Sequence, residues 1–121
     1  MEYTVRESEY RLLCIIWDNE PLTSRQLVEK ASERLGWKKS TTYTVLKWLV
    51  ERGFCVNESA VVSSRIDRSA VQRQASEQVA GIVNEKFGGS LPCFLTAFID
   101  ANGVSDEDAE EIMRMLRERR P

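Results

Sequence analysis

The side chains best suited to binding another molecule lie between Trp37 and Gly53, in the run WKKSTTYTVLKWLVERG. They are cations and short polar groups: Lys38, Lys39, Ser40, Thr41, Tyr43, Thr44 and Lys47. Lysine ammonium groups bind phosphates, whereas hydroxyl, methyl and ammonium groups on one side of a helix can contact base edges. This combination indicates a segment that enters a groove of double-stranded DNA.

The same segment has an apolar side that would orient these polar groups. It consists of Thr42, Val45, Leu46 and Leu49. Their i, i+3, i+4, i+7 spacing is typical of a helix with one buried side. Ser40 can cap this helix at its start, and Gly53 can end it in the left-handed conformation. We interpret the segment as the recognition helix of a helix-turn-helix motif.

Two helices are predicted before this segment. The second of them spans about 24–35; Thr23 and Gln26 have the spacing of a capping box at its start, and Gly36 supplies a stop at its end. The short connection to the recognition helix is what a helix-turn-helix requires.

The first helix is predicted at about 7–18, where Thr4 or Ser8 could cap it. Pro21, in the short stretch that follows, prevents the helix from continuing.

After Gly53 the pattern changes to two short β-prone runs, at 54–56 and 61–64, separated by 57–60. We predict a small two-stranded wing. Arg65 is the cation best placed to reach the flanking DNA backbone or the minor groove. Alternatively, the hairpin only covers the core and Arg65 is solvated.

Three further helices are predicted, at about 69–87, at 91–101 and from Ser105 onward. All have apolar stripes, yet a segment of roughly 45 residues is near the lower limit for burying a core of its own. We therefore predict that they form a homodimer interface; folding back onto the first domain in a monomer is the alternative. The expected fold is mainly α, with a winged helix-turn-helix DNA-binding domain at 1–68 and a three-helix dimerisation region at 69–121.

Charge is segregated along the chain. The 121 residues have a formal net charge of −2, but residues 34–73 contain eight Lys/Arg and three Asp/Glu, so this stretch carries +5 and the remainder −7. Such a distribution is expected when one part of a protein meets phosphates and another does not. A solvated basic face is the alternative.

Composition argues against several other classes of protein. The chain has no His and three scattered Cys, so we expect no metal site, no cofactor and no disulfide framework, and a cytoplasmic location. We expect no membrane insertion, because neither a leader nor a run of about 18 apolar residues is present. We also expect no enzyme, because no nucleophile–base pairing or Gly-rich phosphate loop is apparent.

Four runs are distinctive in combination: EYRLLCIIW at 9–17, PLTSRQLV at 21–28, TTYTVLKWLVERG at 41–53 and FGGSL at 87–91. On these runs the chain resembles the penicillinase repressors of the BlaI/MecI type and their copper-responsive relatives. The resemblance implies a dimeric, cytoplasmic repressor with an N-terminal winged helix and a C-terminal helical dimerisation region.

The resemblance also implies release from the promoter by a membrane-bound sensor protease, in response to an antibiotic-type signal. The family's cleaved bond matches Ala97–Phe98, although such a pair in an amphipathic helix is far more often plain core. The chain departs from the family at the wing, which lacks a basic tip, and at Trp48, where an arginine is more usual. Trp48 could be exposed or could pack against the wing. No Cys follows Cys93, so the copper-sensing cluster of the copper-responsive branch is absent.

The leading hypothesis is a sequence-specific transcriptional repressor that binds a palindromic DNA operator as a homodimer. Lys38 and Lys39 would hold phosphates, and Thr41, Tyr43, Thr44 and Lys47 would face base edges. The alternative is a winged-helix protein-interaction module that does not bind DNA, which the acidic pI of about 5.3, the reduced wing and Trp48 favour slightly.

Overall fold

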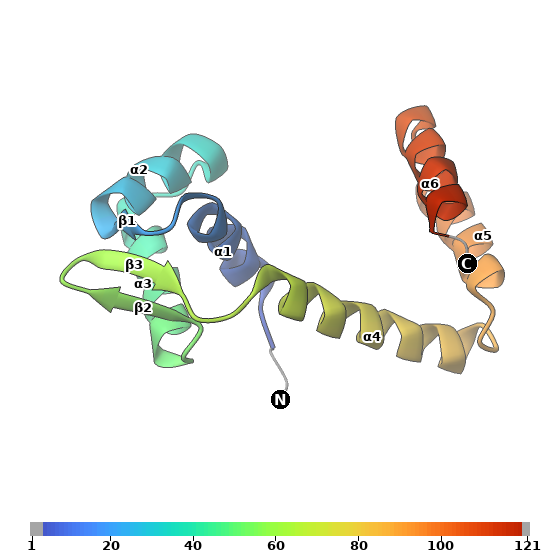
Figure 1. The fold of residues 1–121 in the computed structure, drawn as a ribbon, viewed down its shortest axis with the longest axis horizontal. Helices are drawn as coiled ribbons and strands as arrows, with labels where there is room; N and C mark the ends of the chain where they lie inside the picture. The colour runs from blue at the N-terminus through green and yellow to red at the C-terminus, as the bar shows by residue number, and fades with distance from the viewer. Residues whose placement is uncertain (1–3, 120–121) are drawn as a thin grey trace. The chain divides into compact units, whose positions relative to one another are not determined.

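The computed structural model describes residues 4–119, and within them the chain forms six helices and three short strands (Figure 1). In chain order these are α1 (Glu7–Asn19), β1 (Leu22–Thr23), α2 (Ser24–Leu35), α3 (Lys39–Glu51), β2 (Cys55–Glu58), β3 (Val61–Ser64), α4 (Arg68–Lys86), α5 (Leu91–Asn102) and α6 (Asp106–Glu118). The predicted mainly α class with a winged helix-turn-helix is confirmed.

The chain divides into two compact units, which we call unit 1 (up to Ser76) and unit 2 (from Glu77). The helix α4 contributes residues to both. The predicted division after residue 68 falls at the start of α4, whereas the two units part inside that helix.

In unit 1 the three helices α1, α2 and α3 pack on one another, while β3 contacts α1 and β2 contacts α3. Fully buried side chains come from each helix and from the sheet: Leu12, Leu13, Ile16, Leu27, Leu49 and Val62. Because all the helices contribute to one core, the orientation of each is set by the others.

The helix α1 begins differently from the prediction. Its cap residue is Arg6, and the backbone N–H of Arg6 donates to Oε1 of Glu9 at 3.0 Å. Neither Thr4 nor Ser8 caps α1, since Ser8 already lies inside the helix. The carboxylate of Glu9, three residues into the helix, thus satisfies the cap N–H, while no side chain of the cap residue accepts from the N–H groups of the first turn.

The predicted capping box of α2 is confirmed. Oγ1 of Thr23 accepts from the Gln26 N–H at 3.0 Å, and Oε1 of Gln26 accepts from the Thr23 N–H at 2.9 Å. Gly36 ends α2 with a φ of 68°, the left-handed value that glycine adopts without a steric penalty.

The predicted hairpin is present and its second strand has the predicted bounds, but the first strand extends further and the turn is shorter. Asn57 and Glu58 belong to β2 rather than to the connection. The turn consists only of Ser59 and Ala60, whose φ angles are 52° and 62°. Two-residue turns with positive φ usually contain Gly or Asn, so the sequence carried no signal for this one.

A third strand, which was not predicted, completes the sheet. β1 pairs with β3 in an antiparallel register that places Leu22 opposite Val62, and the strand order is β1–β3–β2. A strand of two residues is too short to show an alternation of apolar and polar residues in the sequence. Its pairing also depends on where the hairpin lies in the fold.

The first turn of α4 is held on α1 by Arg68. Its guanidinium donates to Oδ1 of Asp18 at 2.7 Å and lies 5.2 Å from the ring centre of Trp17. Nε1 of Trp17 in turn donates to the carbonyl of Ile66 at 2.9 Å. The hydrogen bond from Arg68 lowers the pKa of Asp18 below its ordinary value of 3.8, and the positive charges of Arg68 and Arg34 act in the same direction.

Unit 2 leaves most of its large apolar side chains exposed. Among residues 77–119, Val83 is buried. The exposed ones are Val79, Ile82, Leu91, Leu95, Phe98, Ile99, Val104, Ile112, Met113 and Leu116. The predicted helix starts are confirmed, since Ser90 and Ser105 accept hydrogen bonds from the N–H groups of Cys93 and Asp108 at 3.1 and 3.0 Å.

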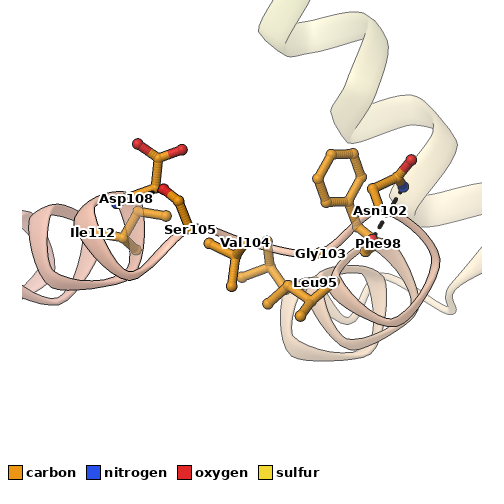
Figure 2. A pocket seen from close by; sticks show the side chains of 9 residues that line it. Leu95, Phe98, Asn102, Gly103, Val104, Ser105, Asp108 and Ile112 are labelled. Atoms are coloured by element: carbon orange, nitrogen blue, oxygen red, sulfur yellow. Dashed lines mark hydrogen bonds between the residues drawn. The ribbon is translucent and has the colours of Figure 1, made fainter.

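A hollow of about 450 Å³ lies between α5 and α6. Figure 2 shows its apolar lining, with Leu95 and Phe98 from α5, Val104 from the connection and Ile112 from α6. No helix within residues 4–119 has the length and hydropathy needed to cross a bilayer.

The ion pair between Arg68 and Asp18 should give the free energy of unfolding a distinctive pH dependence. Because folding lowers the pKa of Asp18, the pair stabilises the fold fully above pH 3.8 and loses its effect as the pH falls through the lowered pKa. We expect Asp18→Asn to lower the urea midpoint at pH 7, and the difference from the parent chain to shrink below pH 3.8. Circular dichroism during urea titration at several pH values measures this.

Asp100→Asn removes the same charge at an exposed position of α5 and serves as the control. If the loss caused by Asp18→Asn were the same at every pH, the carboxylate charge would not be its cause.

Candidate nucleic-acid interface

The helix α3 has the predicted buried side. Thr42 and Leu49 are fully buried, and Val45 and Leu46 are nearly so. These side chains pack into the core of unit 1, so α3 cannot rotate about its axis without exposing them.

The start of α3 differs from the prediction. Its cap residue is Lys38, whose φ and ψ of −71° and 154° are those of a cap, and no side chain caps the helix. Ser40 lies inside the first turn and is exposed, so the prediction that it caps α3 is wrong. Instead, the carbonyl of Ser40 accepts the hydroxyl proton of Thr44 at 2.9 Å.

The end of α3 follows the prediction. Gly53 has a φ of 78°, and its N–H donates to the carbonyl of Val50 at 3.1 Å. The next N–H, that of Phe54, donates to the carbonyl of Leu49 at 2.9 Å. This pair of bonds is the Schellman arrangement, which satisfies carbonyl groups at the end of the helix.

All seven predicted contact residues around α3 are exposed: Lys38, Lys39, Ser40, Thr41, Tyr43, Thr44 and Lys47. Residues at i, i+4, i+7 and i+11 of a helix share one side, so Ser40, Thr44, Lys47 and Glu51 form the most outward row. The predicted groups lie on the exposed surface of α3 and its start, which we call the α3 face, with Thr41 and Tyr43 on its two flanks.

Glu51 is a member of the α3 face that the sequence analysis missed. Its Oε1 lies 3.9 Å from Nζ of Lys47, and both side chains are largely exposed. An exposed pair of this length contributes little to stability, so Lys47 can leave Glu51 and bind another group. The signal in the sequence was the i, i+4 spacing of the two residues.

Trp48 is not fully exposed. It is half-buried against the core of unit 1, and the guanidinium carbon of Arg6 lies 4.9 Å from its ring centre. Because 42 residues separate Arg6 from Trp48 in the chain, no local spacing could have revealed this contact.

Arg65 lies apart from the tip of the wing. It directly follows β3, at the end of the hairpin where Cys55 is opposite Ser64, and its N–H donates to the carbonyl of Phe54 at 2.8 Å. The tip at Ser59 and Ala60 is preceded by the exposed carboxylate of Glu58. The hairpin thus presents its predicted cation at its base, and the tip lacks a cation.

The groups that could hold a metal do not form a site within the described part of the chain. No cluster of three or more His, Cys, Asp or Glu is present among residues 4–119. Burial raises the pKa of the Cys55 thiol to about 12, with a smaller contribution from the charge of Glu20, so this thiol stays protonated at neutral pH. The arrangement of unit 1 supports contacts by hydrogen bonds and positive charge.

Comparisons with known proteins agree with this arrangement. A family profile described as Penicillinase repressor matches residues 5–118. A penicillinase repressor from Bacillus licheniformis is 20% identical over 118 residues, which cover 94% of this chain and 90% of the relative.

Two further matches are more distant or more partial. An uncharacterised 16.5 kDa protein encoded in the ptsI 3′ region of Latilactobacillus sakei is 24% identical over 113 residues, covering 93% of this chain and 77% of the relative. The solution structure of the DNA-binding domain of the repressor BlaI is 21% identical and has a TM-score of 0.48, covering 57% of this chain and 92% of that domain.

Proposed function

The chain belongs to the penicillinase repressor family, and we propose that it represses transcription as a homodimer bound to a palindromic operator. Family membership and the winged-helix fold make it a DNA-binding transcriptional repressor. The homodimer, the symmetry of the operator and the contact residues are our proposal. The observation that carries it is the α3 face, whose hydroxyl and ammonium groups point outward while the opposite side of the helix is buried.

Two kinds of contact follow from the α3 face. Lys38 and Lys39 lie at the N-terminal end of α3, where the helix dipole is positive and the first turn has no acidic residue, so they bind phosphates. Arg65, at the base of the hairpin, adds a phosphate contact. Such contacts fix the position of the helix along the duplex without reading its sequence.

The residues that contact the bases are Thr41, Tyr43, Thr44 and Lys47. The hydroxyl proton of Thr44 is already donated to the carbonyl of Ser40, so Thr44 offers its methyl group and oxygen lone pair. Lys47 offers its ammonium group, which can donate to the acceptors of guanine in the major groove.

The exposed apolar side chains of unit 2 support a homodimer. A segment of this size, with Val83 as its buried apolar residue among 77–119, leaves α5 and α6 without a complete core. A second copy covers the hollow lined by Leu95, Phe98 and Ile112 (Figure 2). Two-fold symmetry then places two α3 faces on half-sites about one helical turn apart, or multiples of it.

Release of the repressor by a sensor protease at Ala97–Phe98 is part of the same proposal. Both side chains are exposed in unit 2, but the bond lies inside α5. Cleavage there requires local unfolding of α5, because the backbone groups of a helix are paired with one another. Since Phe98 also lines the hollow, cutting beside it would disrupt the surface assigned to the second copy.

The two classes of contact on α3 can be separated by substitution. We expect Lys47→Ala to relax preference at one base position by about 1–3 kcal/mol. We expect Lys39→Ala to weaken binding to all sequences alike and to reduce the slope of log K against log salt by about 0.9 for each winged domain bound. Selection from a random duplex library, followed by binding isotherms at several salt concentrations, measures both.

Lys86→Ala removes the same charge at the end of α4 and is the control. Identical, sequence-independent losses for Lys47→Ala and Lys39→Ala would contradict the assignment of roles. No binding of the parent chain to any duplex at low salt would instead favour a protein-interaction module.

The dimer is tested by a charge placed in the hollow. We expect Phe98→Glu to reduce the mass in solution from twice 13.9 kDa toward 13.9 kDa, because a carboxylate buried at the interface would be unpaired. Thr96→Glu, at an exposed position of α5 that does not line the hollow, should leave the dimer intact. Multi-angle light scattering across a concentration series measures the mass, and a monomeric parent chain would overturn the homodimer.

A further inference from the structure

The segment that precedes α1 is attached to α3. The carbonyl of Thr4 accepts a hydrogen bond from the guanidinium of Arg52, and Val5 is half-buried against the core of unit 1. The guanidinium carbon of Arg6 lies 4.9 Å from the ring centre of Trp48. Thr4 therefore contacts the cap residue at the end of α3, Val5 packs on the core, and Arg6 lies over a side chain of α3.

Glu9 anchors this arrangement. Its side chain is fully buried, and its Oε1 accepts from the backbone N–H of Arg6 at 3.0 Å and pairs with Arg52. The same oxygen lies 3.8 Å from Nε of Arg6, too far for a hydrogen bond. Glu9 thus holds the main chain of Arg6 more closely than its guanidinium.

The guanidinium of Arg6 remains available to a ligand. The Arg6 side chain is 59% exposed although it lies over the Trp48 ring. The nearby carboxylate of Glu7 is paired with Arg11 at 2.7 Å. A planar guanidinium supported on an aromatic ring keeps its donors directed outward and loses less side-chain freedom on binding.

The position of Trp48 on α3 indicates which part of a bound duplex lies near the Arg6 guanidinium. Thr41, Thr44 and Trp48 have i, i+3, i+7 spacing and so lie along one flank of the helix. A guanidinium over Trp48 therefore stands beside the α3 face. When a helix occupies the major groove, the groups along its flanks approach the phosphates at the groove edges.

We propose that Arg6 binds a DNA phosphate and that Trp48 is the platform that positions it. This inference rests on the proposed function, since it requires DNA binding through the α3 face. The contact adds a cation from outside the helix-turn-helix, on the flank of α3 opposite to Tyr43, which lines a hollow with Asn57 of β2. Arginine is suited to the role because its two terminal nitrogens bind phosphate oxygens in a bidentate manner.

The test measures the salt dependence of binding to a duplex selected by the parent chain. We expect Arg6→Ala to reduce the slope of log K against log salt by about 0.9 for each winged domain bound, and to weaken binding roughly fivefold to tenfold per domain at 0.1 M salt. Arg6→Lys should retain the slope, because it keeps the charge, but bind less tightly than the parent chain. Arg114→Ala removes an arginine from α6 and should change neither quantity.

The role of Trp48 is tested by a double-mutant cycle. We expect Trp48→Leu to weaken binding severalfold when Arg6 is present and to have little effect in the Arg6→Ala background. Thermal unfolding by circular dichroism confirms that each variant is folded; the backbone cap at residue 6 is unaffected by Arg6→Ala, so this variant tests the proposal even if Trp48→Leu unfolds.

The outcomes separate the two proposals. If the parent chain binds no duplex even at low salt, the proposed function fails. If the parent chain binds but Arg6→Ala keeps its affinity and salt slope, only the role of Arg6 is overturned. Additive losses from Arg6→Ala and Trp48→Leu would overturn the platform role of Trp48.

Discussion

The side chains of Thr42, Val45, Leu46 and Leu49 lie in the core of unit 1, and their burial decides what α3 presents to its surroundings. Burying one Val or Leu side chain contributes about 1.5–3 kcal/mol, and the whole fold of a domain is stable by only about 5–15 kcal/mol. A rotation of α3 that exposed three such residues would cost much of that margin. The polar side of α3 is therefore held outward by the packing of its opposite side.

A buried carboxylate ties the surrounding elements to α3. Glu9 of α1 is fully buried, so its charge must be paired, and Arg52 at the end of α3 provides the partner. The backbone of Arg6 uses the same carboxylate oxygen. The Glu9 carboxylate thus joins α1 and the segment before it to the end of α3. This connection explains how Arg6, which is far from α3 in the chain, lies beside that helix.

The two units differ in how completely they bury their apolar residues. Unit 1 encloses side chains from three helices and a sheet in one core. Unit 2 has helices of comparable length but leaves side chains such as Leu95, Phe98 and Ile112 exposed. The difference follows from size, because a short segment exposes more surface for each residue that it can bury. The proposed DNA contacts and the proposed dimer interface therefore lie in separate parts of the chain, and α4 contributes residues to both units.

The helices, the capping box at Thr23, the helix ends at Gly36 and Gly53 and the outward groups of α3 could be predicted from the sequence. Periodicity and backbone conformation act over a few residues, so a local pattern is enough to reveal them. The start of α3 before Ser40, the strand β1 and the Arg6–Trp48 contact were decided only by the tertiary structure. Each depends either on a contact with a residue distant in the chain or on a backbone conformation that the local sequence does not indicate. Such contacts and conformations are set only when the core has formed.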